Sequence, residues 1–269
     1  MKKKLLISLS VALLLLGAGY LLVMFLDKPM APIANISSDK VMLPDTSNNQ
    51  PAQPIQTIQS SQSATTASAV EIKNTIQLDV PFIVQAPFGN WSNPVFQNGC
   101  EEASIAMAMN WIRGIDDVSQ FSARKQILDI VDFEDANFGY NADTDVFDVA
   151  KIFQRYFQYQ SVEVKESIVV DDIKQALRNG QLVMVPAFGQ ALGNPNYTAP
   201  GPIEHMLVVI GYDPATREFI TNDPGTRKGD GYRYDENVFF NAIWAYPSGS
   251  ASVAVPTGKL KKAMVVVQK

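Results

Sequence analysis

The chain is poor in the two residue types that form disulfides and bind zinc, because its 269 residues include one cysteine and one histidine. A single cysteine excludes an intrachain disulfide. The same scarcity excludes a zinc site built from several cysteine or histidine ligands, although not one built mainly from carboxylates. Any chemistry that combines a thiol with an imidazole must therefore use Cys100 and His205.

An excess of positive charge is also lacking, since the formal net charge is -5 and the charged residues are spread along the chain. No basic patch is evident that would hold a phosphate backbone, so we do not expect nucleic acid as a partner. The length suits one globular domain of moderate size with appendages. We expect a monomer.

A long uncharged segment lies at the N-terminus, where Lys2, Lys3 and Lys4 precede the run from Leu5 to Leu26. As a helix this run would span roughly 33 Å, against a hydrocarbon core of about 30 Å. We expect residues 1–26 to be an uncleaved transmembrane anchor, with a cleaved signal peptide as the alternative. The lysines should stay in the cytoplasm. The sequence therefore predicts a single-pass protein of the cell membrane, with its globular domain outside the cytoplasm.

Residues 27–74 are predicted to be a disordered linker. The stretch 47–68 contains no charged residue and is rich in Ser, Thr, Asn, Gln, Pro and Ala. Such a composition buries too little apolar surface to offset the entropy of ordering. The globular domain then covers residues 75–269.

The order of predicted elements indicates an α+β domain with an antiparallel sheet, because helices come mainly first and strands last. The expected helices cover residues 100–113, 122–131, 144–157 and 170–179. The expected strands cover residues 76–84, 182–187, 205–212, 218–222 and 263–267. The first helix is apolar around nearly its whole circumference, so it should be buried at the centre of the domain.

Cys100 is the candidate nucleophile. It follows a loop rich in Pro, Gly and Asn, residues 85–99, and begins the helix 100–113. A helix N-terminus stabilises the thiolate, so we expect a thiol pKa well below the free value of about 8.5. The alternative is a buried structural cysteine.

His205 is the candidate base, and a predicted hairpin supplies its partner. A three-residue loop, 213–215, would make His205 and Asp223 direct cross-strand neighbours. One loop residue more or less would bring Asn222 or Pro224 opposite instead, so Asn222 is the alternative orienting residue. Asp223 can also be read as a turn residue in Asn-Asp-Pro-Gly. With Asp223 at a strand end, Asp223→Ala should lower turnover strongly and leave thermal unfolding nearly unchanged.

A nucleophile, a base and an orienting acid are the parts of an acyl-transfer site. The oxyanion that forms in such a reaction needs hydrogen-bond donors. Candidates are the backbone N–H of Cys100 and the side chain of Gln85, with Gln97 as a weaker alternative. Trp91 is expected either in the core or as a wall of the cleft, and residues 189–204 either as one rim of the groove or as a surface connection.

Several short motifs occur along residues 75–269. They are Val80-Pro81-Phe82, Gln85-Ala86-Pro87, Gly89-Asn90-Trp91, Asn98-Gly99-Cys100-Glu101-Glu102-Ala103-Ser104, His205 with Val208-Val209-Ile210-Gly211-Tyr212-Asp213, and Asn222-Asp223-Pro224-Gly225-Thr226. Together these motifs resemble the family 39 cysteine peptidases, whose founders cut double-glycine leaders from bacteriocins. More narrowly, residues 75–269 resemble the stand-alone bacterial branch without a transporter.

The resemblance implies a papain-like fold, the triad Cys100, His205 and Asp223, and Gln85 at the oxyanion. It implies a peptide or protein substrate and no cofactor. Two other functions stay open at this point. One is a peptidoglycan endopeptidase or amidase of related fold, and the other is a catalytically inactive peptide-binding module on the same fold.

Overall fold

The computed structural model describes residues 74–249 and 254–269. Residues 1–73, which include the predicted anchor and nearly all of the predicted linker, lie outside the described residues. Within the part that is described, no helix is both long and apolar enough to cross a membrane.

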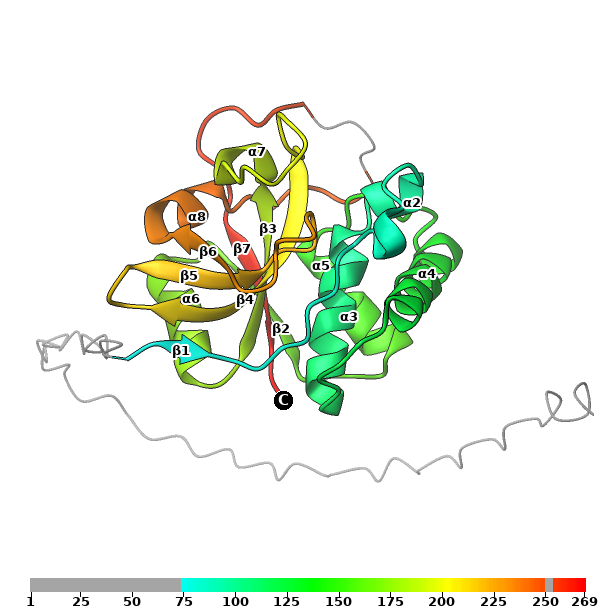
Figure 1. Cartoon of the computed structure of the whole chain (residues 1–269), viewed down its shortest axis with the longest axis horizontal. Helices are drawn as coiled ribbons and strands as arrows, with labels where there is room; N and C mark the ends of the chain where they lie inside the picture. Colours follow the sequence, from blue (N-terminus) through cyan, green and yellow to red (C-terminus); the bar gives the residue numbers. More distant parts are fainter. Residues whose placement is uncertain (1–73, 250–253) are drawn as a thin grey trace, which may run out of the picture. The chain divides into compact units, whose positions relative to one another are not determined.

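Seven antiparallel strands form one sheet, which agrees with the predicted α+β class (Figure 1). The order across the sheet is β2-β7-β3-β4-β5-β6, and β1 pairs with β4. Strands β5 and β7 cover the predicted residues, whereas β2 and β6 were not predicted. The strands are β1 (Ile76–Gln77), β2 (Val162–Glu166), β3 (Leu182–Phe188), β4 (Glu204–Asp213), β5 (Glu218–Asn222), β6 (Tyr232–Asp235) and β7 (Ala263–Val267).

The first predicted helix, α3, begins and ends at the predicted residues, because Gly114 takes a left-handed φ of 67° and ends it. The predicted helix 144–157 instead starts after Asp145, whose side chain caps α5, and continues as the π-helix η2. The helices are η1 (Pro87–Gly89), α2 (Pro94–Gln97), α3 (Cys100–Arg113), α4 (Gln120–Asn137), α5 (Val146–Lys151), η2 (Ile152–Tyr156), α6 (Val170–Arg178), α7 (Gly189–Leu192) and α8 (Glu236–Ala242).

Helices cover both faces of the sheet, as Figure 1 shows for α3 and α4 on one side and α6 and α8 on the other. Successive side chains of a strand point to opposite faces. In β4, Met206 and Val208 therefore pack in the core around α3, and Leu207 and Val209 pack in the core around α6 and α8. This two-sided burial explains why β4 is apolar without interruption. The start of β4 lies beside the start of α3, where Ser104 contacts Met206.

The predicted first strand is too long, because β1 covers only Ile76–Gln77. One further ladder bond follows, from the Leu78 N–H to the Ile210 carbonyl oxygen. Pro81 has no N–H to donate to a ladder, which disfavours extending the strand through it. Residues 78–84 instead lead the chain across to the loop before α3.

Two buried glutamates, Glu102 of α3 and Glu134 of α4, are expected to make the stability of the domain depend on pH. Glu102 and Glu134 are almost completely inaccessible to solvent, and Thr144 donates a hydrogen bond to Glu134 Oε1 at 2.8 Å. Burial raises the pKa of Glu134 to about 7, and it raises the pKa of Glu102 as well, with the Glu134 charge adding to the effect. A folded-state carboxyl pKa above the unfolded value of about 4.3 stabilises the fold at low pH, and this contribution is lost as the pH rises.

We therefore expect the free energy of unfolding to fall as the pH rises from about 4.5 through about 7. Glu134 alone should contribute about 3 kcal/mol to this fall, from a pKa change of about 2.5. Glu134→Gln should flatten the dependence and be more stable than the wild type above neutral pH. Urea unfolding on both sides of neutrality measures the effect. A wild-type stability that rises over this range would contradict the interpretation.

Candidate active site

Cys100 is the first residue of α3, and the link before it determines its position. The side chain of Asn93 caps α2 by accepting a hydrogen bond from the Val95 N–H. Gly99 lies between the two helices, where a Cβ would be 3.1 Å from the Val95 carbonyl oxygen. A glycine therefore fits here better than a larger residue. Cys100 itself is 4% exposed.

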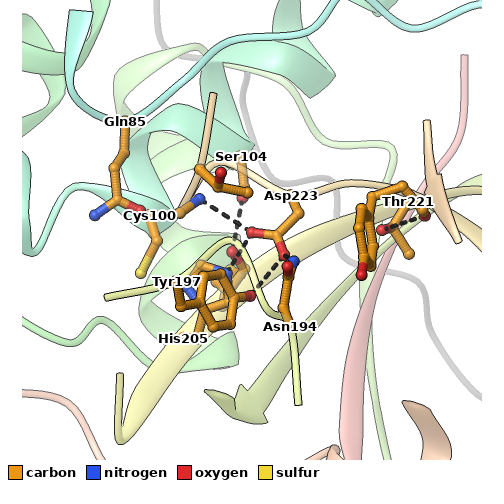
Figure 2. Close-up of polar contacts among 12 residues, drawn as sticks. Gln85, Cys100, Ser104, Asn194, Tyr197, His205, Thr221 and Asp223 are labelled. Carbon is orange, nitrogen blue, oxygen red and sulfur yellow. Dashed lines mark hydrogen bonds and ion pairs between the residues drawn. The ribbon is translucent and has the colours of Figure 1, made fainter. Parts of the chain in front are cut away.

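Cys100 and His205 line the same cavity, which has a volume of about 850 Å³. The start of α3 is held against β4, since Ser104 Oγ donates to the Met206 carbonyl oxygen at 3.5 Å. The backbone of Met206 lies next to the Cys100 sulfur and partly lowers the pKa of the thiol. Figure 2 shows the Cys100 side chain between Gln85 and His205. The structure therefore brings the one thiol and the one imidazole into a single site.

The thiol makes its side-chain hydrogen bond to a carboxylate. Cys100 Sγ–H donates to Glu101 Oε2 at 3.0 Å, and among the described residues no hydrogen bond joins Cys100 to His205. Burial and the Glu101 charge raise the pKa of the Cys100 thiol above its ordinary value, with only partial opposition from the Met206 backbone. The prediction of a lowered thiol pKa is wrong for this conformation, because desolvation and Glu101 outweigh the helix terminus.

His205 and Asp223 are in contact, although the predicted strand register is wrong. Residues 214–217 form a four-residue loop, and the register shifts again between Val209 and Gly211. Val208 therefore faces Asn222, and Asp223 follows the end of β5 without lying opposite His205. The side chains still meet, with His205 Nε2 at 2.8 Å from Asp223 Oδ1. This bond leaves Nδ1 as the ring nitrogen that is free to exchange a proton with a substrate or a thiol.

The Asp223 carboxylate is completely buried and is surrounded by hydrogen-bond donors. Its Oδ2 accepts from the hydroxyls of Tyr197 and Tyr234, each at 2.6 Å, and from Asn194 Nδ2 at 3.2 Å. Burial by itself would raise the pKa of Asp223, but His205 and the two tyrosine hydroxyls lower it below the ordinary value. The carboxylate is therefore ionised and fixed behind the imidazole (Figure 2).

Sequence reasoning missed these supporting residues. Asn194 and Tyr197 lie in the segment 189–204, which was expected either as a rim of the groove or as a surface connection, and Tyr234 lies on the unpredicted strand β6. The Tyr197 ring also meets the His205 ring edge-on, with centroids 5.5 Å apart. Gly225 permits this close packing, because a Cβ there would lie 2.8 Å from His205 Cε1.

Gln85 reaches the site, but its amide hydrogens already have partners. Its Nε2 donates to the carbonyl oxygens of Phe96 at 3.1 Å and Gln97 at 2.8 Å, while Oε1 has no hydrogen-bond partner among residues 74–249 and 254–269. Gln97 is exposed and lines the same cavity. The alternative orienting residue, Asn222, bonds Val80 and Gly231 through its side chain, so it does not orient His205.

The sequence model of the Peptidase C39-like family matches residues 77–252. The chain belongs to this family. Membership of this family makes the chain a cysteine-type peptidase. A search of curated proteins found no match.

Two solved structures are similar to this structure, at low sequence identity. One, described as a C39-like peptidase from Bacillus anthracis, is 17% identical and has a TM-score of 0.46, with 73% of this chain and 98% of that chain covered. The other is xylellain, a cysteine protease from Xylella fastidiosa, with 13% identity, a TM-score of 0.44, and 74% and 87% covered. Both TM-scores lie below 0.5, so the assignment rests on the family model.

In this C39-like peptidase the cavity has acidic and basic parts. Asp143 and Glu204 line it, and burial together with the neighbouring Asp143 carboxyl raises the pKa of Glu204 to about 9. Arg227 and Lys228 line it as well. Trp91 both packs on the core around α3 and lines the cavity, so the two expectations for this residue hold together.

Proposed function

We propose that this chain is a membrane-anchored, extracytoplasmic peptidase of papain-like fold that hydrolyses peptide bonds through Cys100, His205 and Asp223. One observation carries the proposal. The only imidazole is bonded through Nε2 to a buried carboxylate and lines the same cavity as the only thiol. A nucleophile beside a base that is itself oriented by an acid is the arrangement that acyl transfer requires.

In the proposed reaction, the Cys100 proton moves to His205 Nδ1 and the thiolate attacks the peptide carbonyl carbon. The peptide C–N bond breaks, and the imidazolium returns its proton to the leaving amine. Water then attacks the thioester with His205 as base, which releases the acid product and restores the thiol. Asp223 stabilises the imidazolium in both steps, because its pKa is lowered and it stays ionised.

When the thiolate attacks, the oxygen of the substrate carbonyl becomes an oxyanion that needs hydrogen-bond donors. In the proposed complex this oxygen faces the start of α3. The backbone N–H of Cys100 is the first donor, since N–H groups in the first turn of a helix have no intrahelical partner. We propose Gln85 as the second donor. Its longer hydrogen bond, to the Phe96 carbonyl oxygen at 3.1 Å, is the one to be given up when the oxyanion forms.

Gln85→Ala should lower kcat by about 10²- to 10³-fold with little change in KM, because the lost donor acts on the transition state. Gln85→Glu keeps the volume and lacks N–H donors, so it should show a similar loss. Gln97→Ala is the matched control and should leave both constants unchanged. Steady-state kinetics on one cleaved peptide measures all three. A loss confined to Gln97→Ala would assign the role to Gln97.

A peptide library tests the proposed activity directly. The full-length chain in detergent should cut library peptides, as seen by mass spectrometry, and Cys100→Ala should produce no cuts. A parallel digestion of purified peptidoglycan sacculi distinguishes a cell-wall endopeptidase or amidase. If neither substrate is cut by the wild type, the inactive binding module is the better interpretation.

The anchor is a separate part of the proposal, supported by the basic and apolar sequence of residues 1–26. In fractionated bacterial cells, the full-length chain should stay with membranes in alkaline carbonate and be extracted by detergent. A chain that starts at residue 27 should be soluble. A full-length product shortened by the mass of the apolar segment would show a cleaved signal peptide instead.

A further inference from the structure

The Cys100 thiol has a second polar neighbour that the proposed reaction does not use. Glu101 Oε2 accepts the thiol hydrogen bond at 3.0 Å, and the hydroxyl of Tyr246 donates to Glu101 Oε1. Glu101 is 1% exposed and Tyr246 is 2% exposed. Each oxygen of the Glu101 carboxylate therefore accepts a hydrogen bond from a different side chain. These two bonds fix the orientation of the carboxylate, and with it the position of the Cys100 sulfur.

Apart from the two hydrogen-bond donors on Glu101, Tyr246 and Cys100, the charged groups that act on this cluster are carboxylates. The Asp143 charge acts on Glu101, and the Glu101 charge acts in turn on Glu102, Glu134 and Glu204. None of these five carboxyls takes part in a salt bridge within the described part of the chain. A thiolate at Cys100 is therefore strongly disfavoured as long as Glu101 is ionised.

We propose that Glu101 is a positioning residue for the nucleophile, whose ionised form holds the thiol in a resting orientation and whose protonated form releases it to His205. A proton from solvent adds to Glu101 Oε2 and weakens the bond from Cys100. The sulfur then turns to the imidazole, and the thiol proton moves to His205 Nδ1. The resulting thiolate lies beside a neutral carboxyl group. This inference rests on the proposed function, in which Cys100 and His205 react together.

The pH at which release occurs follows from the environment of Glu101. Burial raises its pKa to about 7, although the hydrogen bonds from Tyr246 and Cys100 lower it in part. Below neutral pH the sulfur should be released, and above it the sulfur should be held. The reactivity of Cys100 should therefore fall about tenfold between one pH unit below and one above this pKa.

Alkylation of the full-length chain by iodoacetamide across the neutral range tests this without a peptide substrate. The wild-type rate should fall about tenfold as the pH rises through about 7. In Glu101→Gln the fall should disappear, because no carboxylate forms. Glu102→Gln is the matched control, since Glu102 is equally buried on the same helix and burial raises its pKa as well. It should behave like the wild type.

Tyr246→Phe is a second variant in case Glu101→Gln does not fold. It removes a bond that lowers the pKa of Glu101, so the fall in reactivity should move to higher pH. An unchanged profile in Glu101→Gln, or in Tyr246→Phe where Glu101→Gln does not fold, overturns the inference. So does an equal change in Glu102→Gln. A chain that shows the Glu101-dependent profile but cuts no peptide would refute the proposed peptidase while leaving the role of Glu101 intact.

Discussion

Cys100→Ala and His205→Ala are each expected to lower peptide cleavage by about 10⁶-fold, and the double variant should be no slower than either single one. The reason is that the thiol and the imidazole act as one unit, so losing either removes the thiolate pathway entirely. Initial rates on the library peptide that the wild type cuts fastest measure the effect.

Folding should be unaffected in Cys100→Ala, because alanine is the best helix former and the lost side chain is small. Thermal unfolding of both variants provides this control. Two losses that multiply in the double variant would contradict the account, since they would mean that Cys100 and His205 act independently.

Asp223→Ala is expected to impair stability and activity together. It leaves the donors of Tyr197, Tyr234, Asn194 and His205 facing an empty, buried space. Removing one partner of such a buried charged network costs about 3–5 kcal/mol. For a domain of this size the melting temperature should fall by roughly 10 °C. Turnover of the folded fraction should fall by about 10²- to 10⁴-fold, because His205 loses the group that orients it.

Asp223→Asn separates the two effects. Its side-chain oxygen can still accept from His205 Nε2, and the two tyrosine hydroxyls can accept from its amide. Both stability and turnover should therefore lie between those of the wild type and Asp223→Ala. A stable, fully active Asp223→Ala protein would show that the carboxylate does not orient His205.

The expectation that Asp223→Ala would leave stability unchanged came from the sequence, which shows Asp223 in a turn motif at a strand end. The structure buries the residue under Asn194, Tyr197 and Tyr234, which lie 29, 26 and 11 residues away along the chain. Such contacts between distant segments leave no local pattern. The pairing of His205 with Asp223 was nevertheless predicted from the hairpin, because a carboxylate just beyond β5 can reach the imidazole despite the shifted register.

The helix α3 was predicted to the residue because its signals are local: a glycine at each end and an apolar surface between them. The strands β2 and β6 were missed because they are short and half polar, and β2 is held by pairing with β7 about a hundred residues later. The effect of Glu101 on the thiol was missed for a related reason. A glutamate after Cys100 suits a helix N-terminus, and only the burial beside Tyr246 turns it into a competing partner for the sulfur.

The most direct test of the account is whether the one thiol and the one imidazole can be joined. 1,3-Dibromoacetone has two electrophilic carbons and alkylates a thiol first and then a neighbouring nitrogen. After treatment of the full-length chain and proteolysis, mass spectrometry should find the peptide that contains Cys100 linked to the peptide that contains His205, and this link should be absent in His205→Ala. A wild-type chain that carries only single adducts on Cys100 would contradict the central claim that these two residues react as a pair.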